Sequence, residues 1–271
     1  MPRLGLGLGL TMGGNILGVG LSAEALAWEA RIVANGGTIL PATLQIFDTH
    51  FFRPAVLNGS ILTELDRLNV YCGLVGYEIA ARTNLIKSAH FVTPVSSPTF
   101  DNNGYKSAGT GYLNLNYDRA IHGDKNGNTD NNFGCVVDGV TYAVDRNIIG
   151  GAVGARNQFL QRFTTPRVQA ANNSNNTQNA SNAPTGRIFI ASTKSSATAG
   201  TIIVNDTVTV ATFTDFSNVN TSQFELTYAV SGSPAGNYDT NYHLCSHHGS
   251  NSLAYAAFKA ILINLFTALG V

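Results

Sequence analysis

The densest group of potential metal ligands in this sequence is formed by His243, Cys245, His247 and His248. Imidazole and thiolate are the groups that zinc sites use, and a structural site needs four of them in a tetrahedron. We expect His243 and Cys245 to alternate on a strand, and His247 and His248 to lie in the turn before the last helix. No second cluster in the sequence completes such a site. Burial of these residues within the protein is therefore the competing interpretation.

A polar segment in the middle of the chain has side-chain oxygens at alternate positions, as calcium loops do: Asp124, Asn126, Asn128 and Asp130. It departs from the EF-hand pattern, because Thr129 takes the glycine position and Cys135 takes that of the bidentate glutamate. A sandwich loop can also bind calcium with carbonyl oxygens from elsewhere. Calcium is thus the one candidate cofactor, and a plain polar turn is the alternative.

Serine, histidine and aspartate, which form many catalytic sites, are present, but not in the spacing of a known catalytic motif. There is no Gly-x-Ser-x-Gly nucleophile elbow, and Gly5, Gly7 and Gly9 lack the following helix of a dinucleotide site. Glycosidases use paired carboxylates, and no close pair stands out in the region from about residue 68 onward, where we expect strands. The cysteines Cys72, Cys135 and Cys245 are odd in number and far apart, which indicates buried thiols rather than disulfides. The sequence predicts that the protein is not an enzyme.

Exposed aromatic side chains could instead stack on sugar rings. The candidates are five tyrosines: Tyr105, Tyr112, Tyr117, Tyr238 and Tyr242. The competing interpretation is that these rings fill the edges of a β-sandwich.

Composition narrows the classes of partner. Lys plus Arg equals Asp plus Glu at 16 each, and charged residues make up 12% of the 271 positions. A surface that binds nucleic acid or anionic lipid would need a basic excess. No stretch of 18 strongly apolar residues occurs, so we expect no membrane span. The 44% hydrophobic content is ample for a core.

Leucine and glycine alternate at the start of the chain, which suits an extended arm over residues 1–21. Burying each large apolar side chain would contribute roughly 1.5–3 kcal/mol. Ordering the backbone costs about 1–2 kcal/mol per residue, so a partner must supply the apolar groove. We therefore expect a homo-oligomer or attachment to a larger particle through these side chains: Leu4, Leu6, Leu8, Leu10, Ile16, Leu17 and Leu21.

A helical segment is expected over residues 22–67. Ser22 can cap a helix that ends at the Gly36-Gly37 pair, with Leu26, Ala30 and Val33 on one apolar stripe. A second helix over 42–53 should stop at Pro54, and a third should span 60–67. Trp28 and Phe47 should pack these helices together.

Residues 68–271 read as strands followed by one helix. The apolar runs 187–193, 201–213 and 224–230 are expected to be strands of one sheet, on the inner face of a sandwich. Within the middle run a three-residue loop that pairs Val204 with Val208 would place all the apolar side chains on one face, so we prefer it to a two-residue turn.

The rest of this region has weaker signals. Residues 112–116, 148–153 and 159–163 should be strands, and 133–144 a hairpin that turns at Asp138-Gly139. The asparagine-rich segment 169–184 should be an exposed loop. An apolar stripe predicts a closing helix over 252–269.

The order of these features resembles the laminin-G-like, concanavalin-type sandwich proteins found among tailed-bacteriophage structural genes. The resemblance covers most of the chain from about Trp28 onward. It is carried by segments 65–72, 98–100, 111–114, 133–137, 202–210 and 267–270. It implies a mainly β, antiparallel two-sheet jelly roll with N-terminal helices and a C-terminal helix.

Three hypotheses remain. The first, implied by the resemblance, is a non-enzymatic virion structural protein on a particle surface, neck or tail, whose partners are other virion proteins, itself and a host-surface glycan. The second is a carbohydrate-binding module, and the third is a polysaccharide-degrading enzyme. The arm favours the first, because a free-standing binding module has little use for alternating leucines.

Overall fold

A computed structural model gives the structure of the chain. It describes residues 20–125, 129–141, 143–153, 155–163, 167–172, 174, 176–181, 184–214, 222–227, 229–230, 233–234 and 236–271. The arm residues Leu4 to Leu17 and the calcium candidates Asn126 and Asn128 lie outside these ranges. No helix in the described ranges is long and apolar enough to cross a membrane.

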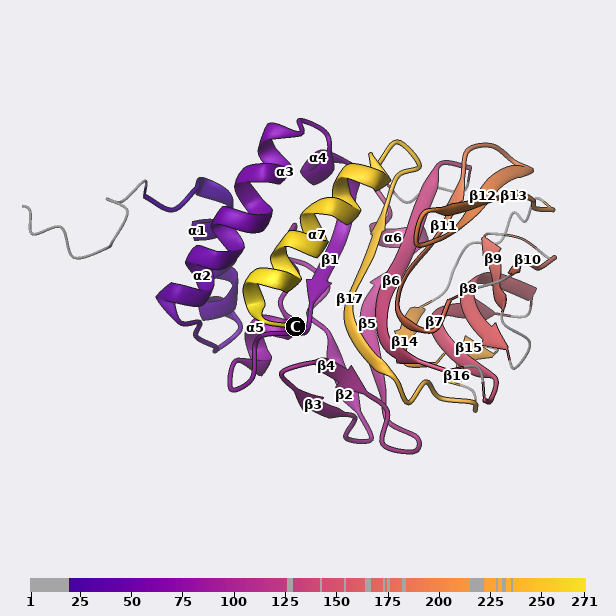
Figure 1. The fold of residues 1–271 in the computed structure, drawn as a ribbon, viewed down its shortest axis with the longest axis horizontal. Coiled ribbons are helices and arrows are strands. Elements are labelled where there is room, and N and C mark those ends of the chain that lie inside the picture. Colours follow the sequence, from indigo (N-terminus) through magenta and orange to yellow (C-terminus); the bar gives the residue numbers. More distant parts are fainter. Residues whose placement is uncertain are drawn as a thin grey trace, which may run out of the picture.

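The fold is an antiparallel two-sheet sandwich, as the sequence predicts (Figure 1). One sheet has eight strands in the spatial order β13 (Thr207–Thr212), β12 (Ala199–Val204), β11 (Gly186–Lys194), β6 (Asn131–Val140), β17 (Tyr242–Gly249), β4 (Gly104–Lys106) and β3 (Thr99–Asp101), with β1 (Leu65–Val70) also paired to β17. The other has seven, in the order β10 (Gln178–Ser181), β9 (Arg167–Asn172), β8 (Ala155–Phe163), β7 (Arg146–Val153), β14 (Ser222–Glu225), β5 (Tyr112–Asp118) and β2 (Thr93–Val95). A small ribbon joins β15 (Ala229–Val230) to β16 (Ser233–Pro234).

Helices form a third layer on the outer side of the eight-stranded sheet (Figure 1). They are α1 (Ala23–Ala34), α2 (Pro41–Phe47), the π-helix η1 (Asp48–Phe52), α3 (Arg53–Leu57), α4 (Ile61–Glu64) and the C-terminal α7 (Tyr255–Leu269), with the short α5 (Glu78–Arg82) and α6 (Arg119–His122) elsewhere. Helix α7 lies between the N-terminal helices and β17. Its Phe258 ring meets His247 of β17 at 5.1 Å between centroids, and Phe266 meets Phe189 of β11 at 6.3 Å.

Helix α1 begins as predicted, because the Ser22 hydroxyl accepts a hydrogen bond from the Ala25 amide. The predicted apolar stripe is wrong. Leu26 and Val33 are 49% and 61% exposed, whereas Ala25, Trp28 and Ile32 are buried. The Trp28 ring decides which face turns inward, since it is the largest side chain of the helix. It packs on Phe47 at 4.5 Å between centroids, as predicted.

The second predicted helix does not stop at Pro54. Helix α2 passes into η1 and then into α3, which continues to Leu57. Proline is tolerated in the first turn of a helix, where its missing N–H is not required, and Pro54 occupies that place in α3. The third predicted helix is shorter than expected, because β1 already begins at Leu65.

The hairpin between β12 and β13 has the register that the sequence argument rejected. Val204 pairs with Thr207 across a two-residue turn. Asn205 adopts φ 53°, the left-handed conformation that such turns require, and its side chain accepts from the Phe189 amide at 2.9 Å. The run 224–230 is also placed differently, since its strand β14 belongs to the other sheet.

Two further predictions fail through features that resemble turns and loops in sequence. Asp138 and Gly139 form no hairpin turn but a bulge within β6, where both stand opposite Arg187 and Gly139 has φ 73°. The asparagine-rich segment 169–184 contains β9 and β10, and its Asn172 is buried and donates to Ser192 Oγ at 3.1 Å. An asparagine side chain can be buried when its amide is hydrogen-bonded, so a high asparagine content does not by itself indicate an exposed loop.

Candidate functional site

Two tyrosine rings stack where β5 begins. Tyr112 is the first residue of β5, and Tyr238 lies in the segment before β17; their centroids are 6.5 Å apart and the ring planes meet at 28°. Phe224 of β14 packs edge-on against Tyr112 at 5.6 Å. Both tyrosines are partly exposed, whereas Phe224 is 6% exposed and supports them. We call Tyr112, Tyr238 and Phe224 the aromatic patch.

Amide and hydroxyl groups continue this surface along the outer face of the seven-stranded sheet. Strand β5 alternates, with Leu113, Leu115 and Tyr117 buried and the intervening side chains outside. Asn114 stands in register with Thr93 of β2 and with Phe224, so these three share the outer face. Asn116 Nδ2 donates to Thr93 Oγ1 at 2.9 Å. The outer face thus offers ring surface beside neutral hydrogen-bonding groups.

Each of two patch residues is followed in sequence by a buried carboxylate. Glu225 follows Phe224 and Asp239 follows Tyr238, and both carboxylates bind the same imidazole. His243 Nδ1 lies 2.8 Å from Glu225 Oε1, and His243 Nε2 lies 3.1 Å from Asp239 Oδ2. All three side chains are fully buried. The outward rings are therefore positioned by inward neighbours that are fixed in the core.

Opposite charges stabilise one another in this triad. Burial alone would lower the pKa of His243, but its hydrogen bonds and attraction to Asp239 and Glu225 raise that pKa to about 9. Burial alone would raise the pKa of Glu225, yet His243, with a smaller contribution from Arg67, holds it below its usual value. The histidine is consequently an imidazolium at neutral pH, held between two carboxylates.

The buried network extends between the sheets. Tyr71 and Ser246 hydroxyls both donate to Glu225 Oε2, at 2.6 and 2.5 Å. Arg67 Nη1 donates to Asn69 Oδ1 at 2.8 Å. No pattern in the sequence predicts this network. Its members come from β1, β14, β17 and the segments after them, and no local spacing brings Glu225 next to Tyr71.

The five predicted tyrosines divide into three groups. Tyr112 and Tyr238 meet in the aromatic patch. Tyr105 and Tyr117 are fully buried, so neither offers a ring face to a ligand. Tyr242 lies apart from the patch, on β17, where its hydroxyl donates to Asp101 Oδ2 at 2.5 Å and Lys106 Nζ sits 4.5 Å from its ring centre.

The predicted histidine–cysteine cluster is contained in β17 as a whole, so His247 and His248 belong to the strand and not to a turn. His247 packs on Phe258 of α7, on the other side of the sheet from His243, and its Nε2 donates a hydrogen bond to Asn132 Oδ1 at 3.0 Å. Burial lowers the pKa of His247 to about 3. Across the described residues, no group of three potential ligands could hold a metal ion. The three cysteines are free and buried, as predicted.

The polar segment proposed for calcium has a protein cation beside it. Lys87 Nζ lies 2.8 Å from Asp124 Oδ2 and 2.8 Å from Asp66 Oδ1. Asp130 accepts from the Asn251 amide at 2.7 Å. Each described aspartate of this segment is thus already engaged by a donor of the chain itself. Leu21, the one apolar side chain of the predicted arm that lies in the described ranges, is partly buried and packs against the core of its own chain.

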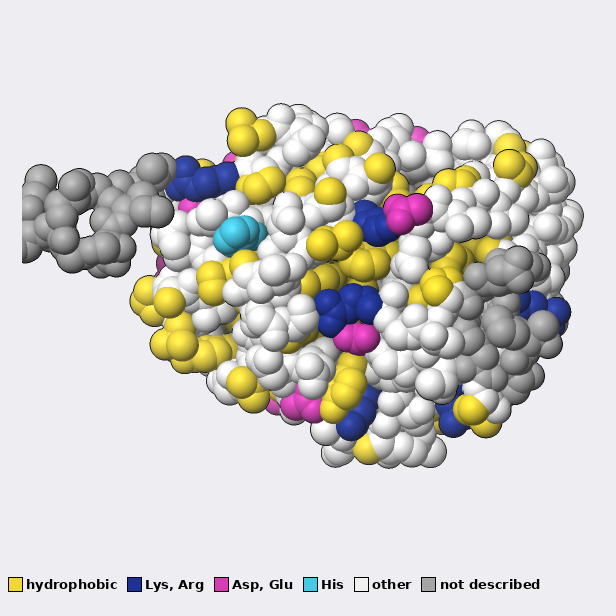
Figure 2. Space-filling model, viewed as in Figure 1, with side chains coloured by type: hydrophobic (Ala, Val, Ile, Leu, Met, Phe, Trp, Pro, Cys, Tyr) yellow, Lys and Arg dark blue, Asp and Glu magenta, His cyan; other side chains and the backbone are white. Residues whose placement is uncertain are grey.

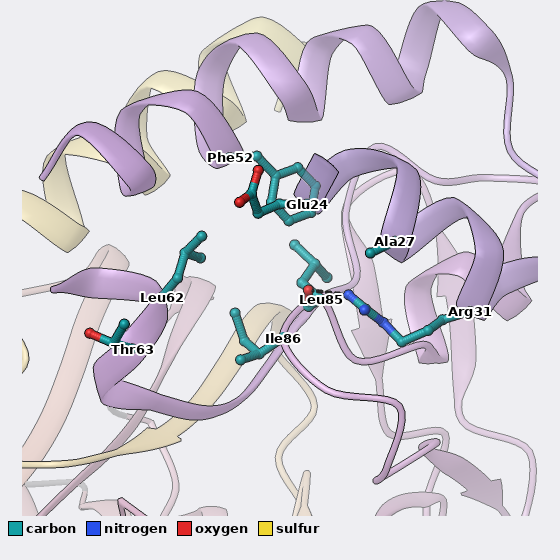
Figure 3. Close-up of a pocket in the computed structure, with 8 residues that line it drawn as sticks. All are labelled: Glu24, Ala27, Arg31, Phe52, Leu62, Thr63, Leu85 and Ile86. Atoms are coloured by element: carbon teal, nitrogen blue, oxygen red, sulfur yellow. Dashed lines mark hydrogen bonds between the residues drawn. The ribbon is translucent and has the colours of Figure 1, made fainter. Parts of the chain in front are cut away.

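A separate groove of about 240 Å³ lies among the N-terminal helices (Figure 3). It is lined by Glu24, Ala27, Arg31, Phe52, Leu62, Thr63, Leu85 and Ile86. Arg31 does not present its charge to a ligand, because its guanidinium donates to the Asn84 and Leu85 carbonyls at 3.2 and 2.5 Å. Figure 2 shows apolar side chains exposed at the left end of the molecule, over the helices. The exposed apolar residues of the helical part include Leu40, Val56 and Leu57.

Comparison with known proteins gives a fold and no family. No protein-family model and no curated protein sequence matches the chain. Among solved structures, it is similar to a Trypanosoma rangeli sialidase, with a TM-score of 0.52, 10% identity and coverage of 83% of this chain and 39% of that one. It is also similar to the botulinum neurotoxin serotype D binding domain, with a TM-score of 0.51, 10% identity and coverage of 76% and 52%.

A shorter likeness is to a sialidase carbohydrate-binding module, CBM40, of Ruminococcus gnavus, at a TM-score of 0.39 and 11% identity over 50% of this chain and 82% of that one. The chain spans about half or less of the lengths of the sialidase and the neurotoxin domain. The likenesses to the sialidase and to the neurotoxin domain show the fold, a concanavalin-like β-sandwich, which confirms the fold implied by the resemblance. The bacteriophage assignment is not supported by them and stays a prediction.

Proposed function

We propose that this protein is a non-enzymatic carbohydrate-binding module and that the aromatic patch is its binding surface. The observation that carries the proposal is the stacked, partly exposed pair Tyr112 and Tyr238 on the outer sheet face. An aromatic ring offers apolar area to the C–H face of a sugar while its hydroxyl remains free to hydrogen-bond. Asn114 and Thr93 add the few placed polar groups that fix a ligand's orientation.

The buried triad supports binding without catalysis. Glu225, Asp239 and His243 are the residue types of acid–base chemistry, but a general acid or base must come within hydrogen-bond reach of its substrate. All three are fully enclosed between the sheets. They preorganise the exposed rings, since Glu225 and Asp239 anchor the backbone next to Phe224 and Tyr238.

The fold is compatible with this role, because the botulinum neurotoxin structure that it resembles is a binding domain. The residues named in and beside the patch carry no formal charge, which favours neutral oligosaccharides over acidic ones. A virion location, and partners on a particle, remain part of the first hypothesis from the sequence. They would be consistent with a module that attaches to surface glycans.

Isothermal titration with neutral oligosaccharides and with sialyllactose tests the proposal. We expect binding of a neutral oligosaccharide by the full chain, and at least about tenfold weaker binding by Tyr112→Ala and Tyr238→Ala, since losing one aromatic contact costs on the order of 1.4 kcal/mol. Tyr242→Ala is the matched control, because that ring is also partly exposed but lies outside the patch. Equal loss in all three variants, or in none, would refute the assignment.

A further inference from the structure

The strands at the ends of the two sheets, β13 and β3 in one and β10 and β2 in the other, differ in how they are protected against pairing with another chain. Edge strand β3 has three residues and includes Asp101, and β2 has three and includes Pro94. Edge strand β10 reads Gln-Asn-Ala-Ser and is entirely without large apolar side chains. Short length, charge and proline are the usual devices that stop edge-to-edge association.

Edge strand β13 has none of these devices. Its sequence is Thr-Val-Thr-Val-Ala-Thr, which is rich in β-branched residues and has neither charge nor proline. Val208 and Val210 are 58% and 84% exposed, although valine is normally buried. Within the described ranges no strand lies beyond β13 in its sheet.

The register of the hairpin determines which backbone groups face outward. Because Val204 pairs with Thr207 across a two-residue turn, Thr207 and Thr209 direct their N–H and C=O groups to β12. The groups of Val208 and Val210 consequently point away from the sheet. The next outward carbonyl, at Thr212, is taken by Asn176 Nδ2 and Gln178 Nε2 at 3.0 and 2.8 Å. The described chain provides such side-chain partners at the end of the strand but none at the two valines.

We propose that β13 is a self-association surface and that its partner is β13 of a second copy of this chain. Two antiparallel copies related by a two-fold axis at Thr209 would place Val208 opposite Val210 of the second copy, and the reverse. Each such pair exchanges two backbone hydrogen bonds. The arrangement is isologous, so the same uncharged strand supplies both sides.

This register also covers the exposed apolar side chains. Val208 and Val210 lie on the same face of β13, so pairing gathers the four valines of the two copies into one cluster. Thr209 lies on the opposite face and meets Thr209 of the second copy at a pair without hydrogen bonds. The two eight-stranded sheets become one continuous sheet, and the outer face of each seven-stranded sheet stays open.

Sedimentation of the full chain over a wide concentration range tests the proposal. We expect a dimer, a Val210→Lys variant that associates at least about tenfold more weakly, and an unchanged dimer for Leu57→Lys. Leu57 is 85% exposed on α3, which makes it a matched control for added charge at an exposed apolar site. A monomeric wild type, or a Val210→Lys variant that dimerises like the wild type, would overturn the proposal.

Cross-linking tests the register independently of the strength of association. The Thr209→Cys variant should form an intermolecular disulfide under mild oxidation, because the two Cα atoms of a non-hydrogen-bonded pair lie about 4.5 Å apart, within the range for disulfides. Thr207→Cys should not, since the two copies of residue 207 are offset along the strands. The native cysteines are buried and do not compete. Cross-linking of Thr207→Cys alone, or of neither variant, contradicts this pairing.

Discussion

Glu225 and His243 form a fully buried ion pair, 2.8 Å between Oε1 and Nδ1, that joins the seven-stranded sheet to the eight-stranded one. Glu225 belongs to β14 and His243 to β17. The pair fixes the spacing of the two sheets beside the aromatic patch. Phe224 of the patch precedes Glu225 in sequence, and Tyr238 precedes Asp239, the second partner of His243. The stability of the sandwich and the geometry of its candidate site therefore depend on the same contact.

Glu225→Gln should destabilise the protein by about 3 kcal/mol, because it removes one of the two carboxylates that hold the buried imidazolium and the anionic acceptor of the Tyr71 and Ser246 hydroxyls. Urea denaturation measures this change. Asp138→Asn is the control, since the Asp138–Arg187 pair has both side chains 32% exposed and should contribute less than about 1 kcal/mol. Equal losses for the two variants would mean that the buried pair has no special role.

Stability should fall as the pH rises through the pKa of His243. That pKa is raised in the folded protein to about 9, against about 6.5 for an ordinary histidine. The folded state therefore binds the proton more tightly than the unfolded state does. The stability that the protonated His243 contributes is fully present below pH 6.5 and is lost as the pH passes 9. Thermal midpoints between pH 6.5 and 9 should decline in the wild type and decline less in His243→Gln. If the thermal midpoint of His243→Gln fell with pH as steeply as that of the wild type, His243 would not be the source of the pH dependence.

Gly134→Ala should destabilise the eight-stranded sheet. A Cβ at this position of β6 would lie 2.1 Å from the Ile190 carbonyl oxygen and 2.8 Å from His247 Cε1. Overpacking of this kind costs about 1–3 kcal/mol, and here one of the opposing atoms is backbone. Gly236→Ala is the control, because a Cβ there meets nothing within 4 Å. A thermal midpoint for Gly134→Ala equal to that of the control would contradict the packing.

Calcium should not stabilise the folded protein. Lys87 Nζ, bound to Asp66 and Asp124, occupies the place that a cation would need. The two carboxylates raise the pKa of Lys87 although burial alone would lower it, so the lysine remains charged. A ligand present at a hundredfold excess over its Kd would add about 2.7 kcal/mol of stability. We expect equal thermal midpoints in excess calcium and in EDTA, and a rise of several degrees in calcium would restore the calcium hypothesis.

Much of the fold could be predicted because its signals are local. The Ser22 cap, the alternation of β5 and the glycine after α7 each depend on neighbours in sequence. The register of the β12–β13 hairpin could not be predicted by assuming one buried face. Strand β13 lies at an edge, where Val208 and Val210 are exposed, so burial does not select its register.

The site itself depends on contacts that no local pattern encodes. Tyr112 and Tyr238 are candidates on residue type alone, but so are the buried Tyr105 and Tyr117. Tyr112 and Tyr238 differ from Tyr105 and Tyr117 in the direction of their rings, which are partly exposed in the first pair and buried in the second. Likewise, Glu225 and Asp239 contact His243 only after the two sheets have packed. Neither carboxylate belongs to a recognisable motif in its own segment of the sequence.

The most direct test of glycan binding at the aromatic patch is an NMR titration. The isotope-labelled full chain is titrated with a neutral oligosaccharide that binds it in isothermal titration. We predict that the largest amide shifts fall at Tyr112, Asn114, Phe224 and Tyr238, and that Tyr112→Ala removes them. Shifts clustered instead around the groove of Glu24, Leu62 and Ile86, or a complete absence of shifts across a panel of neutral and acidic oligosaccharides, would contradict this prediction.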